Sequence, residues 1–228
     1  MTRVKICGAT NDEDVRVAVD AGADAVGVIS DVPVDTPREV DPSDAADLVA
    51  AAPPFVTTVL VTMPEDAGAV AELARTVGPD VLQLHADFDA DALRFVRAES
   101  RAKIVPVVDH ADPDRAHALD GVADALLVDS TDEDGAGGTG ETHDWDRTQE
   151  LVRDLDSPVV LAGGLDPDNV AAAVETVRPY AVDVASGIER VGGRKDPEAV
   201  GAFVRAVADA DAHESGTPDE ERPRRGGA

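Results

Sequence analysis

The chain has 228 residues, 43% of them hydrophobic and only 3% aromatic, so its length and composition suit one core built from Val, Ala, Leu and Ile. Asp and Glu number 47 against 20 Lys and Arg, and the formal net charge of −27 excludes the basic face that nucleic-acid binding needs. No apolar run is long enough to cross a membrane, and the single cysteine, Cys7, excludes an internal disulfide framework and a cysteine-based zinc site. The N-terminal residues lack the apolar region of a signal peptide, so we expect a soluble, cytoplasmic protein.

Short apolar runs recur along the chain and are predicted to be strands. In chain order they cover residues 3–7, 25–29, 56–61, 81–84, 103–107, 125–128, 159–161 and 181–184. Between them lie segments with helical patterns, several of which open on Asp, Asn or Ser and close near Gly or Pro. The clearest cover residues 11–21, 43–52, 65–77, 89–99, 144–154 and 167–177.

This alternation indicates an α/β fold. Each strand run is continuously apolar, as expected for strands that are buried on both faces. Eight such units predict a single (β/α)₈ TIM barrel over residues 1–209, with a doubly wound open sheet as the alternative. Residues 210–228 are polar and show no periodicity, so we expect them to form a disordered tail.

Glycine-containing turns follow the last two predicted strands. Gly163 and Gly164 end one strand, and Ser186 and Gly187 end the other. Small residues let backbone N–H groups approach an anion, and a helix N-terminus adds a favourable dipole. Two such turns after the last two strands form the usual phosphate site of a barrel. The sequence therefore predicts a phosphorylated small molecule as the ligand of these four residues.

Catalytic residues of a barrel lie at the carboxyl ends of its strands. Cys7 ends the first strand, next to Gly8 and the start of a helix, a setting that favours a thiolate able to act as base or nucleophile. Asp129 ends the sixth strand. A thiol and a carboxyl on opposite sides of the barrel mouth suit proton removal at one atom and proton delivery at another. The alternatives are a buried apolar cysteine and a loop-anchoring aspartate.

Further candidates lie in the loops and at other strand ends. Arg38, after the second strand, suits recognition of a carboxylate, although loop arginines are often simply solvated. His85 ends the fourth strand and could equally be a structural histidine. The glycine-rich stretch 135–140 could fold over a ligand or form a solvated linker. The remaining histidines show no ligand spacing, so we expect no metal site.

Taken together, these motifs resemble the phosphoribosylanthranilate isomerase family of tryptophan biosynthesis. The resemblance is carried, in family order, by Val4-Lys5-Ile6-Cys7-Gly8, Thr36-Pro37-Arg38, Leu82-Gln83-Leu84-His85, Leu127-Val128-Asp129-Ser130, Gly137-Gly138-Thr139-Gly140, Leu161-Ala162-Gly163-Gly164-Leu165, and residues 182–189 and 193–196. It covers essentially residues 3–205, and the combination of the first motif with the Gly-Gly-Thr-Gly loop is highly specific.

The resemblance implies an Amadori rearrangement of N-(5-phosphoribosyl)anthranilate. In that reaction Asp129 matches the general acid that opens the ribose ring, and Cys7 matches the general base that takes the proton from C2. Arg38 matches the residue that holds the anthranilate carboxylate. Further substrate contacts are implied at His85, Gly138 and Asp183. The family needs no cofactor, because the hydrogen moves within one molecule.

Two other functions are compatible with a phosphate-binding barrel. The histidine-pathway isomerase performs the same rearrangement but normally uses two aspartates, so Cys7 counts against it. A non-catalytic barrel that binds a phosphorylated metabolite is disfavoured by the joint presence of Cys7, Asp129 and Arg38. We expect a monomer or a homodimer. The charge of −27 indicates a salt-accumulating host, because the Debye length shrinks to about 3 Å at 1 M salt.

Overall fold

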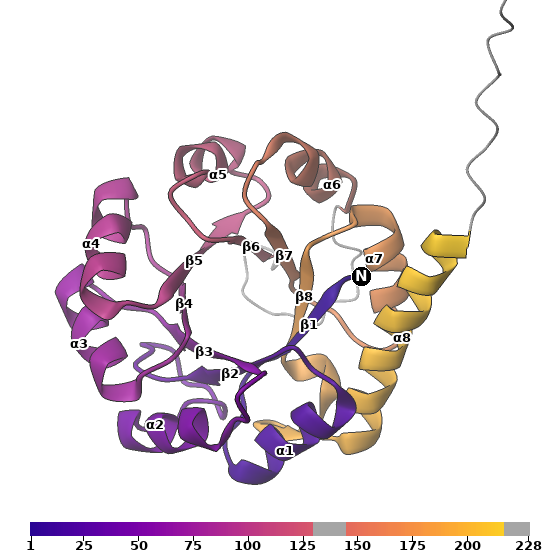
Figure 1. Cartoon of the computed structure of the whole chain (residues 1–228), viewed down its shortest axis with the longest axis horizontal. Coiled ribbons are helices and arrows are strands. Elements are labelled where there is room, and N and C mark those ends of the chain that lie inside the picture. The colour runs from indigo at the N-terminus through magenta and orange to yellow at the C-terminus, as the bar shows by residue number, and fades with distance from the viewer. Residues whose placement is uncertain (130–144, 217–228) are drawn as a thin grey trace, which may run out of the picture.

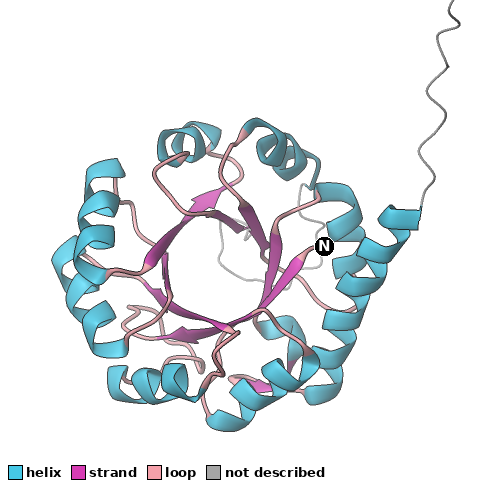
Figure 2. Cartoon of the chain, viewed as in Figure 1, coloured by secondary structure: helices cyan, strands magenta, loops and turns pink. Residues whose placement is uncertain are grey.

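The computed structural model describes residues 1–129 and 145–216, which form a ring of parallel strands inside a ring of helices (Figures 1 and 2). The barrel strands are β1 (Arg3–Ile6), β2 (Ala25–Ile29), β3 (Thr57–Thr62), β4 (Val81–Leu84), β5 (Lys103–Asp109), β6 (Leu126–Asp129), β7 (Val159–Ala162) and β8 (Ala181–Val184). The helices are α1 (Asp12–Ala21), α2 (Pro42–Ala51), α3 (Ala67–Val77), α4 (Ala90–Ser100), α5 (Pro113–Leu119), α6 (Trp145–Asp154), α7 (Val170–Val177) and α8 (Pro197–Gly216). After β8 come a short 3₁₀ helix, η1 (Ser186–Ile188), and a small hairpin of β9 (Glu189–Val191) and β10 (Arg194–Lys195).

The barrel closes between the first and the last of its strands. β1 pairs in parallel with β2 on one side and with β8 on the other, and Lys5 lies opposite Asp183 in the register with β8. The strand order around the ring is β1 to β8 without interruption. The predicted (β/α)₈ barrel is therefore confirmed, and the open sheet is excluded.

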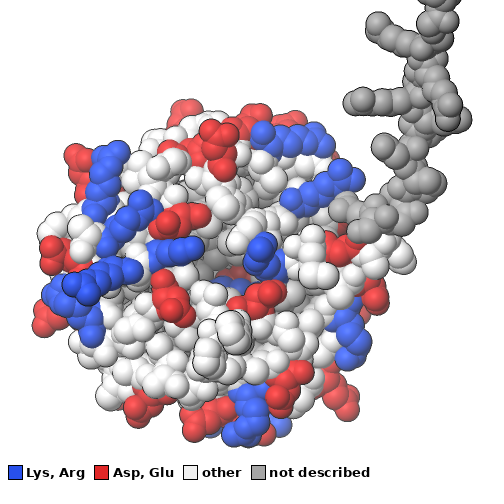
Figure 3. Space-filling model, in the orientation of Figure 1, with Lys and Arg blue, Asp and Glu red and all other residues white. Residues whose placement is uncertain are grey.

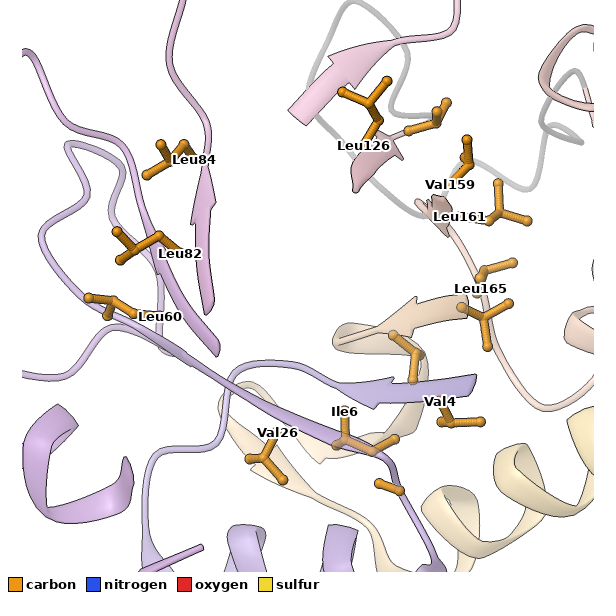
Figure 4. Close-up of a cluster of buried hydrophobic side chains, with 14 of the residues drawn as sticks. Val4, Ile6, Val26, Leu60, Leu82, Leu84, Leu126, Val159, Leu161 and Leu165 are labelled. Atoms are coloured by element: carbon orange, nitrogen blue, oxygen red, sulfur yellow. The ribbon is translucent and has the colours of Figure 1, made fainter. Parts of the chain in front are cut away.

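The two faces of each strand have different surroundings, because successive side chains point to opposite sides. One face packs against the helices in a single large cluster, which includes Ile6, Leu82 and Leu126 (Figure 4). Two smaller clusters, one around Leu127 and one around Val59, fill the inside of the barrel. The polar residues of the candidate site lie on this inner face. The strands therefore alternate between residues that pack against the helices and residues that face the barrel interior, although their sequences are mostly apolar.

Local caps set where the helices begin and end. Asn11, Asp66 and Asp89 each accept hydrogen bonds from backbone N–H groups in the first turns of α1, α3 and α4. Gly22 and Gly78 end α1 and α3 in the left-handed conformation. The sequence indicated that helices begin at Asp or Asn and end near Gly, and these three helix starts and two helix ends follow that pattern. None of the described helices is long and apolar enough to cross a membrane.

The C-terminal helix α8 extends beyond the expected start of the tail. It continues to Gly216, and Val207 and Ala210 on it are 1% and 2% exposed. The Asp211 carboxylate accepts hydrogen bonds from the backbone N–H and the hydroxyl of Thr2. The expected boundary at residue 210 is thus too early, because polar composition hid a helix face that packs on the core. Residues 217–228 lie outside the described part.

A cavity of about 400 Å³ opens at the ends where the strands begin. Small side chains, such as Ala25, Ala125 and Ala181, line much of it, and Arg3 and Lys103 also contribute. Figure 3 shows the molecule hollowed at the centre of the barrel, with charges of both signs nearby. The cavity extends from this end into the barrel interior, where Lys5 and Gln83 also line it.

Candidate active site

Lys5 on β1 and Cys7, which directly follows β1, point to the same inner side, because one residue separates them in extended chain. The N–H of Cys7 donates to the Val184 carbonyl on β8 (2.8 Å), and its side chain is buried. Gly27 on β2 provides room for both side chains, since a Cβ there would lie 3.0 Å from Cys7 Sγ and 3.1 Å from Lys5 Cε. The thiol thus sits at the tip of β1, directly above Lys5.

Lys5 forms an ion pair with Asp183 inside the barrel. Lys5 Nζ lies 2.7 Å from Asp183 Oδ2, and the two side chains are only 8% and 7% exposed. Burial lowers the pKa of Lys5, but the favourable interactions with Asp183 and Cys7 together outweigh burial, and the pKa rises. The other carboxylate oxygen, Asp183 Oδ1, is buried and has no hydrogen-bond partner among the described residues. This oxygen can accept a further hydrogen bond.

The surroundings of Cys7 act on its thiol in opposite directions. Burial raises the pKa of the thiol, and the carboxylate of Asp183 adds to this rise. The charge of Lys5 opposes both, as does the more distant charge of Lys195. The net pKa is above the usual value of a thiol, because burial outweighs the opposing charges. Without the ammonium of Lys5 the pKa would be higher still, so Lys5 limits the cost of forming a thiolate in this site.

His85 follows β4 and faces the same interior. Burial lowers its pKa to about 4, and the nearby charge of Lys5 acts in the same direction. Gln83 Nε2 lies 3.1 Å from His85 Nε2. Because an amide nitrogen only donates, this contact makes Nε2 the acceptor and leaves the imidazole proton on Nδ1. His85 is therefore a neutral side chain with a fixed tautomer near neutral pH.

Asp129 is the last residue of β6 and lies at the same end of the barrel as Cys7. Its neighbours in the strand register are Asp109 on β5 and Ala162 on β7, and its side chain is half-buried. β7 and β8 separate β6 from β1 around the ring. The fold thus brings a thiol and a carboxyl to the same end of the barrel, on strands that two others separate.

Arg38 lies between β2 and α2 and covers the tip of β1. A Cβ on Gly8 would lie 2.8 Å from Arg38 Cδ, so the arginine packs directly on the glycine that follows Cys7. Its Nε and Nη2 donate to the two carboxylate oxygens of Glu189 (2.9 and 2.8 Å). Glu189 also accepts from the buried Lys195 Nζ (2.9 Å). These contacts hold Arg38 at the mouth, beside Cys7.

Glu189 remains ionised in this setting. Burial would raise the pKa of its carboxyl, but hydrogen bonds from Arg38 and Lys195 outweigh burial and leave the pKa below the usual range. The Arg38 guanidinium therefore has a permanent counter-charge on one edge, which fixes its orientation.

The two glycine turns adjoin each other. Gly163 and Gly164 have φ values of 88° and 60°, which favour glycine. A Cβ on Gly187 would lie only 2.1 Å from the carbonyl oxygen of Leu165, so the turn after β8 packs against the turn after β7. Gly164, Ser186 and Gly187 are exposed at the surface of this junction. The structure thus brings the four predicted phosphate residues together at one junction.

One predicted substrate contact cannot be placed. Gly138 and the glycine-rich stretch 135–140 lie outside the described residues.

The model of one protein family, described as N-(5'-phosphoribosyl)anthranilate (PRA) isomerase, matches residues 4–206. The chain belongs to this family. It is 61% identical over 204 residues to the N-(5'-phosphoribosyl)anthranilate isomerase of Halorubrum lacusprofundi, covering 90% of this chain and 95% of the relative. It is 60% identical over 210 residues to that of Haloferax volcanii, covering 92% and 95%.

Solved phosphoribosylanthranilate isomerases share the fold. A crystal structure from Thermotoga maritima has a TM-score of 0.82 and 36% identity, and the match covers 92% of this chain and 100% of that chain. A second, with a TM-score of 0.79, 32% identity and the same coverage, is described in complex with reduced 1-(o-carboxyphenylamino)-1-deoxyribulose 5-phosphate. The chain is therefore an isomerase of tryptophan biosynthesis, and the histidine-pathway enzyme and the non-catalytic barrel are set aside.

Sequence reasoning missed four side chains that shape this isomerase site, namely Lys5, Gln83, Glu189 and Lys195. A signal was available for two of them. The chain contains only three lysines, Lys5, Lys103 and Lys195, and the first and last of these are buried. A lysine in so acidic a chain, two positions before Cys7 and therefore on the same face, indicated a specific local role.

Proposed function

We propose that this isomerase carries out the Amadori rearrangement by acid–base catalysis between Asp129 and Cys7. Asp129 protonates the ribose ring oxygen of N-(5'-phosphoribosyl)anthranilate, and the ring opens to a Schiff base. The Cys7 thiolate then takes the proton from C2, which leaves an enolamine that becomes the 2-ketone. The observation that carries the proposal is the inward thiol of Cys7 at the barrel mouth that also holds Asp129 and the glycine turns.

The same proposal assigns the substrate's anionic groups to two parts of the mouth. The phosphate binds backbone N–H groups of the joined turns at Gly163, Gly164, Ser186 and Gly187, as expected for glycine turns after the last two strands. The anthranilate carboxylate binds Arg38, whose contacts with Glu189 engage Nε and Nη2 and leave the donors of Nη1. Further contacts are proposed at His85, Asp183 and Gly138.

The reaction needs no external oxidant or reductant. C1 of the sugar is reduced while C2 is oxidised, and protons that Asp129 and Cys7 exchange with the substrate complete the transfer. No cofactor is therefore part of the proposal. We also propose a cytoplasmic location and a monomer or a homodimer, and light scattering of the purified chain distinguishes the two assemblies.

Fluorescence of the anthranilate group, followed during isomerisation, tests the catalytic pair. We expect Cys7→Ser to retain the fold and ligand binding but lose most of kcat, because a hydroxyl is a far weaker base than a thiolate. Wild-type turnover in this variant would show that Cys7 is not the base.

Asp129→Asn keeps the shape of the side chain but has no acidic proton to give. We expect kcat to fall by at least about 10²-fold, the usual scale for a positioned acid. A change confined to KM would mean that Asp129 only binds the substrate.

A further inference from the structure

Lys5 is a buried cation that the proposed reaction leaves without a task. Its side chain is 8% exposed, it is paired with Asp183 at 2.7 Å, and its Cε shares with Cys7 Sγ the space above Gly27. A buried ion pair adds little net stability, because desolvation of the two charges cancels most of their attraction. The placement of Lys5 points instead to an effect on its neighbour Cys7.

The charges around Cys7 come from several elements. The charge of Lys5 on β1 lowers the pKa of the thiol, and the charge of Asp183 on β8 raises it. Lys195 on β10 acts more weakly in the same sense as Lys5. His85 beyond β4 is neutral at working pH, since its pKa is about 4.

Three further charged groups, Arg38, Glu189 and Asp129, lie at the mouth. Arg38, which packs on Gly8, is paired with Glu189, so the two charges largely compensate each other at the thiol. Asp129 on β6 faces the mouth from across β7 and β8. Lys5 is thus the cation with the largest effect on the thiol.

We propose that Lys5, anchored by Asp183, is a positioning residue that holds its ammonium against Cys7 and stabilises the thiolate that accepts the proton from C2. This inference rests on the proposed role of Cys7 as the base. Asp183 keeps Lys5 protonated in the interior and fixes its place in the ring, because it lies opposite Lys5 in the β1–β8 register. At this buried site the ammonium stabilises the thiolate, as solvation by bulk water would stabilise an exposed thiolate.

A thiolate titration without substrate tests this role directly. Cys7 is the chain's single cysteine, so the absorbance near 240 nm of each variant, minus that of the same variant carrying Cys7→Ser, reports its ionisation alone. We expect the Cys7 thiol of Lys5→Met to titrate at higher pH than that of wild type. At a fixed pH below the midpoint, the fraction of thiolate should fall by about tenfold or more. The direction is the same whether Asp183 stays charged or takes up a proton, because Lys5 outweighs Asp183 at the thiol.

The pH profile of kcat/KM supplies the second readout. In Lys5→Met the rise of kcat/KM with pH should shift to higher pH by as much as the titration and recover towards wild type in alkaline buffer. A merely structural role would lower activity at every pH. Lys103→Met is the matched control. Lys103 is the first residue of β5 and so lies at the end of the barrel opposite to Cys7, and its substitution should leave the titration of the thiol unchanged.

A second variant covers the case in which Lys5→Met does not fold. Lys5→Met combined with Asp183→Asn removes both buried charges, and the thiol should again titrate at higher pH than in wild type. An unchanged titration in the folded variants, or an equal shift in Lys103→Met, would overturn the role of Lys5. That outcome leaves Cys7 as the base, whereas wild-type turnover in Cys7→Ser overturns the base assignment itself.

Discussion

His85 shows how the barrel interior sets the ionisation of a single residue. Its ring is surrounded by the inner faces of the strands and lies near the Lys5 ammonium, and the pKa falls to about 4. The same interior leaves the Cys7 thiol with a raised pKa. In both residues desolvation penalises the charged form, and it is the sign of the nearby Lys5 charge that separates them: it disfavours an imidazolium and favours a thiolate.

This shift of His85 predicts a loss of stability in mild acid. The unfolded chain binds a proton at His85 below a pH of about 6.5, whereas the folded chain does so only below about 4. The contribution of His85 to the free energy of unfolding is therefore constant above this pH window and falls as the pH drops through it. Between about pH 7 and about pH 5 the free energy of unfolding should fall by about 2 kcal/mol because of His85.

Chemical denaturation at constant high salt measures this loss. The variant His85→Asn has no group that titrates in the window and should lose about 2 kcal/mol less than wild type over the same pH range. Equal losses in the two proteins would contradict the assignment.

At the scale of elements, the proposed phosphate site depends on a contact between two turns. The turn after β7 and the turn after β8 meet where Gly187 packs on the Leu165 carbonyl. Asn169, at the start of α7, donates from Nδ2 to the Gly164 carbonyl (2.8 Å) and so holds the first turn on its helix. The packing of β7, α7 and η1 as a unit thus shapes the proposed phosphate site.

Two alanine substitutions separate this packing from simple backbone strain. Gly187→Ala puts a Cβ into the Leu165 carbonyl and must push the turns apart, whereas a Cβ on Gly164 meets nothing within 4 Å. Gly164→Ala should cost only about 1–2 kcal/mol for its positive φ. We expect Gly187→Ala to weaken competitive inhibition by inorganic phosphate and to raise KM more than Gly164→Ala does. The reverse order would show that the two turns bind phosphate independently.

At the scale of the whole molecule, a protein with a net charge of −27 must bind a substrate that carries a phosphate and a carboxylate. The cations at the mouth give little net attraction, because Lys5 is paired with Asp183, and Arg38 and Lys195 share Glu189. Attraction therefore depends on backbone N–H groups, helix dipoles and the donors of Arg38 that remain. Repulsion between distant surface carboxylates is relieved only by mobile ions.

Salt should therefore raise both stability and activity. We expect the thermal midpoint and kcat/KM to increase from dilute buffer towards molar KCl, as suits relatives from Halorubrum and Haloferax. Arg38→Ala should weaken substrate binding at every salt concentration, because its effect is local. Values that are flat, or highest in dilute buffer, would contradict the halophilic interpretation without affecting the isomerase assignment.

The sequence by itself determined most of the local structure and the ends of the strands. Apolar runs and capping residues depend on neighbours along the chain, so periodicity located the eight strands and the starts of helices such as α1 and α4. Strand ends then predicted Cys7, Asp129 and the two glycine turns. The end of α8 was misjudged, because its last turns are stabilised by contacts with the core and with Thr2, which polar composition does not reveal.

Only the tertiary structure decided which side chains meet inside the ring. Lys5 and Asp183 are 178 positions apart, and Arg38 and Glu189 are 151 apart, so no local pattern couples them. They come together because β1 closes the barrel against β8 and brings the last loops over the first strand. In the closed barrel these side chains are buried, and a charge that water would screen in solution then shifts the ionisation of Cys7 and His85.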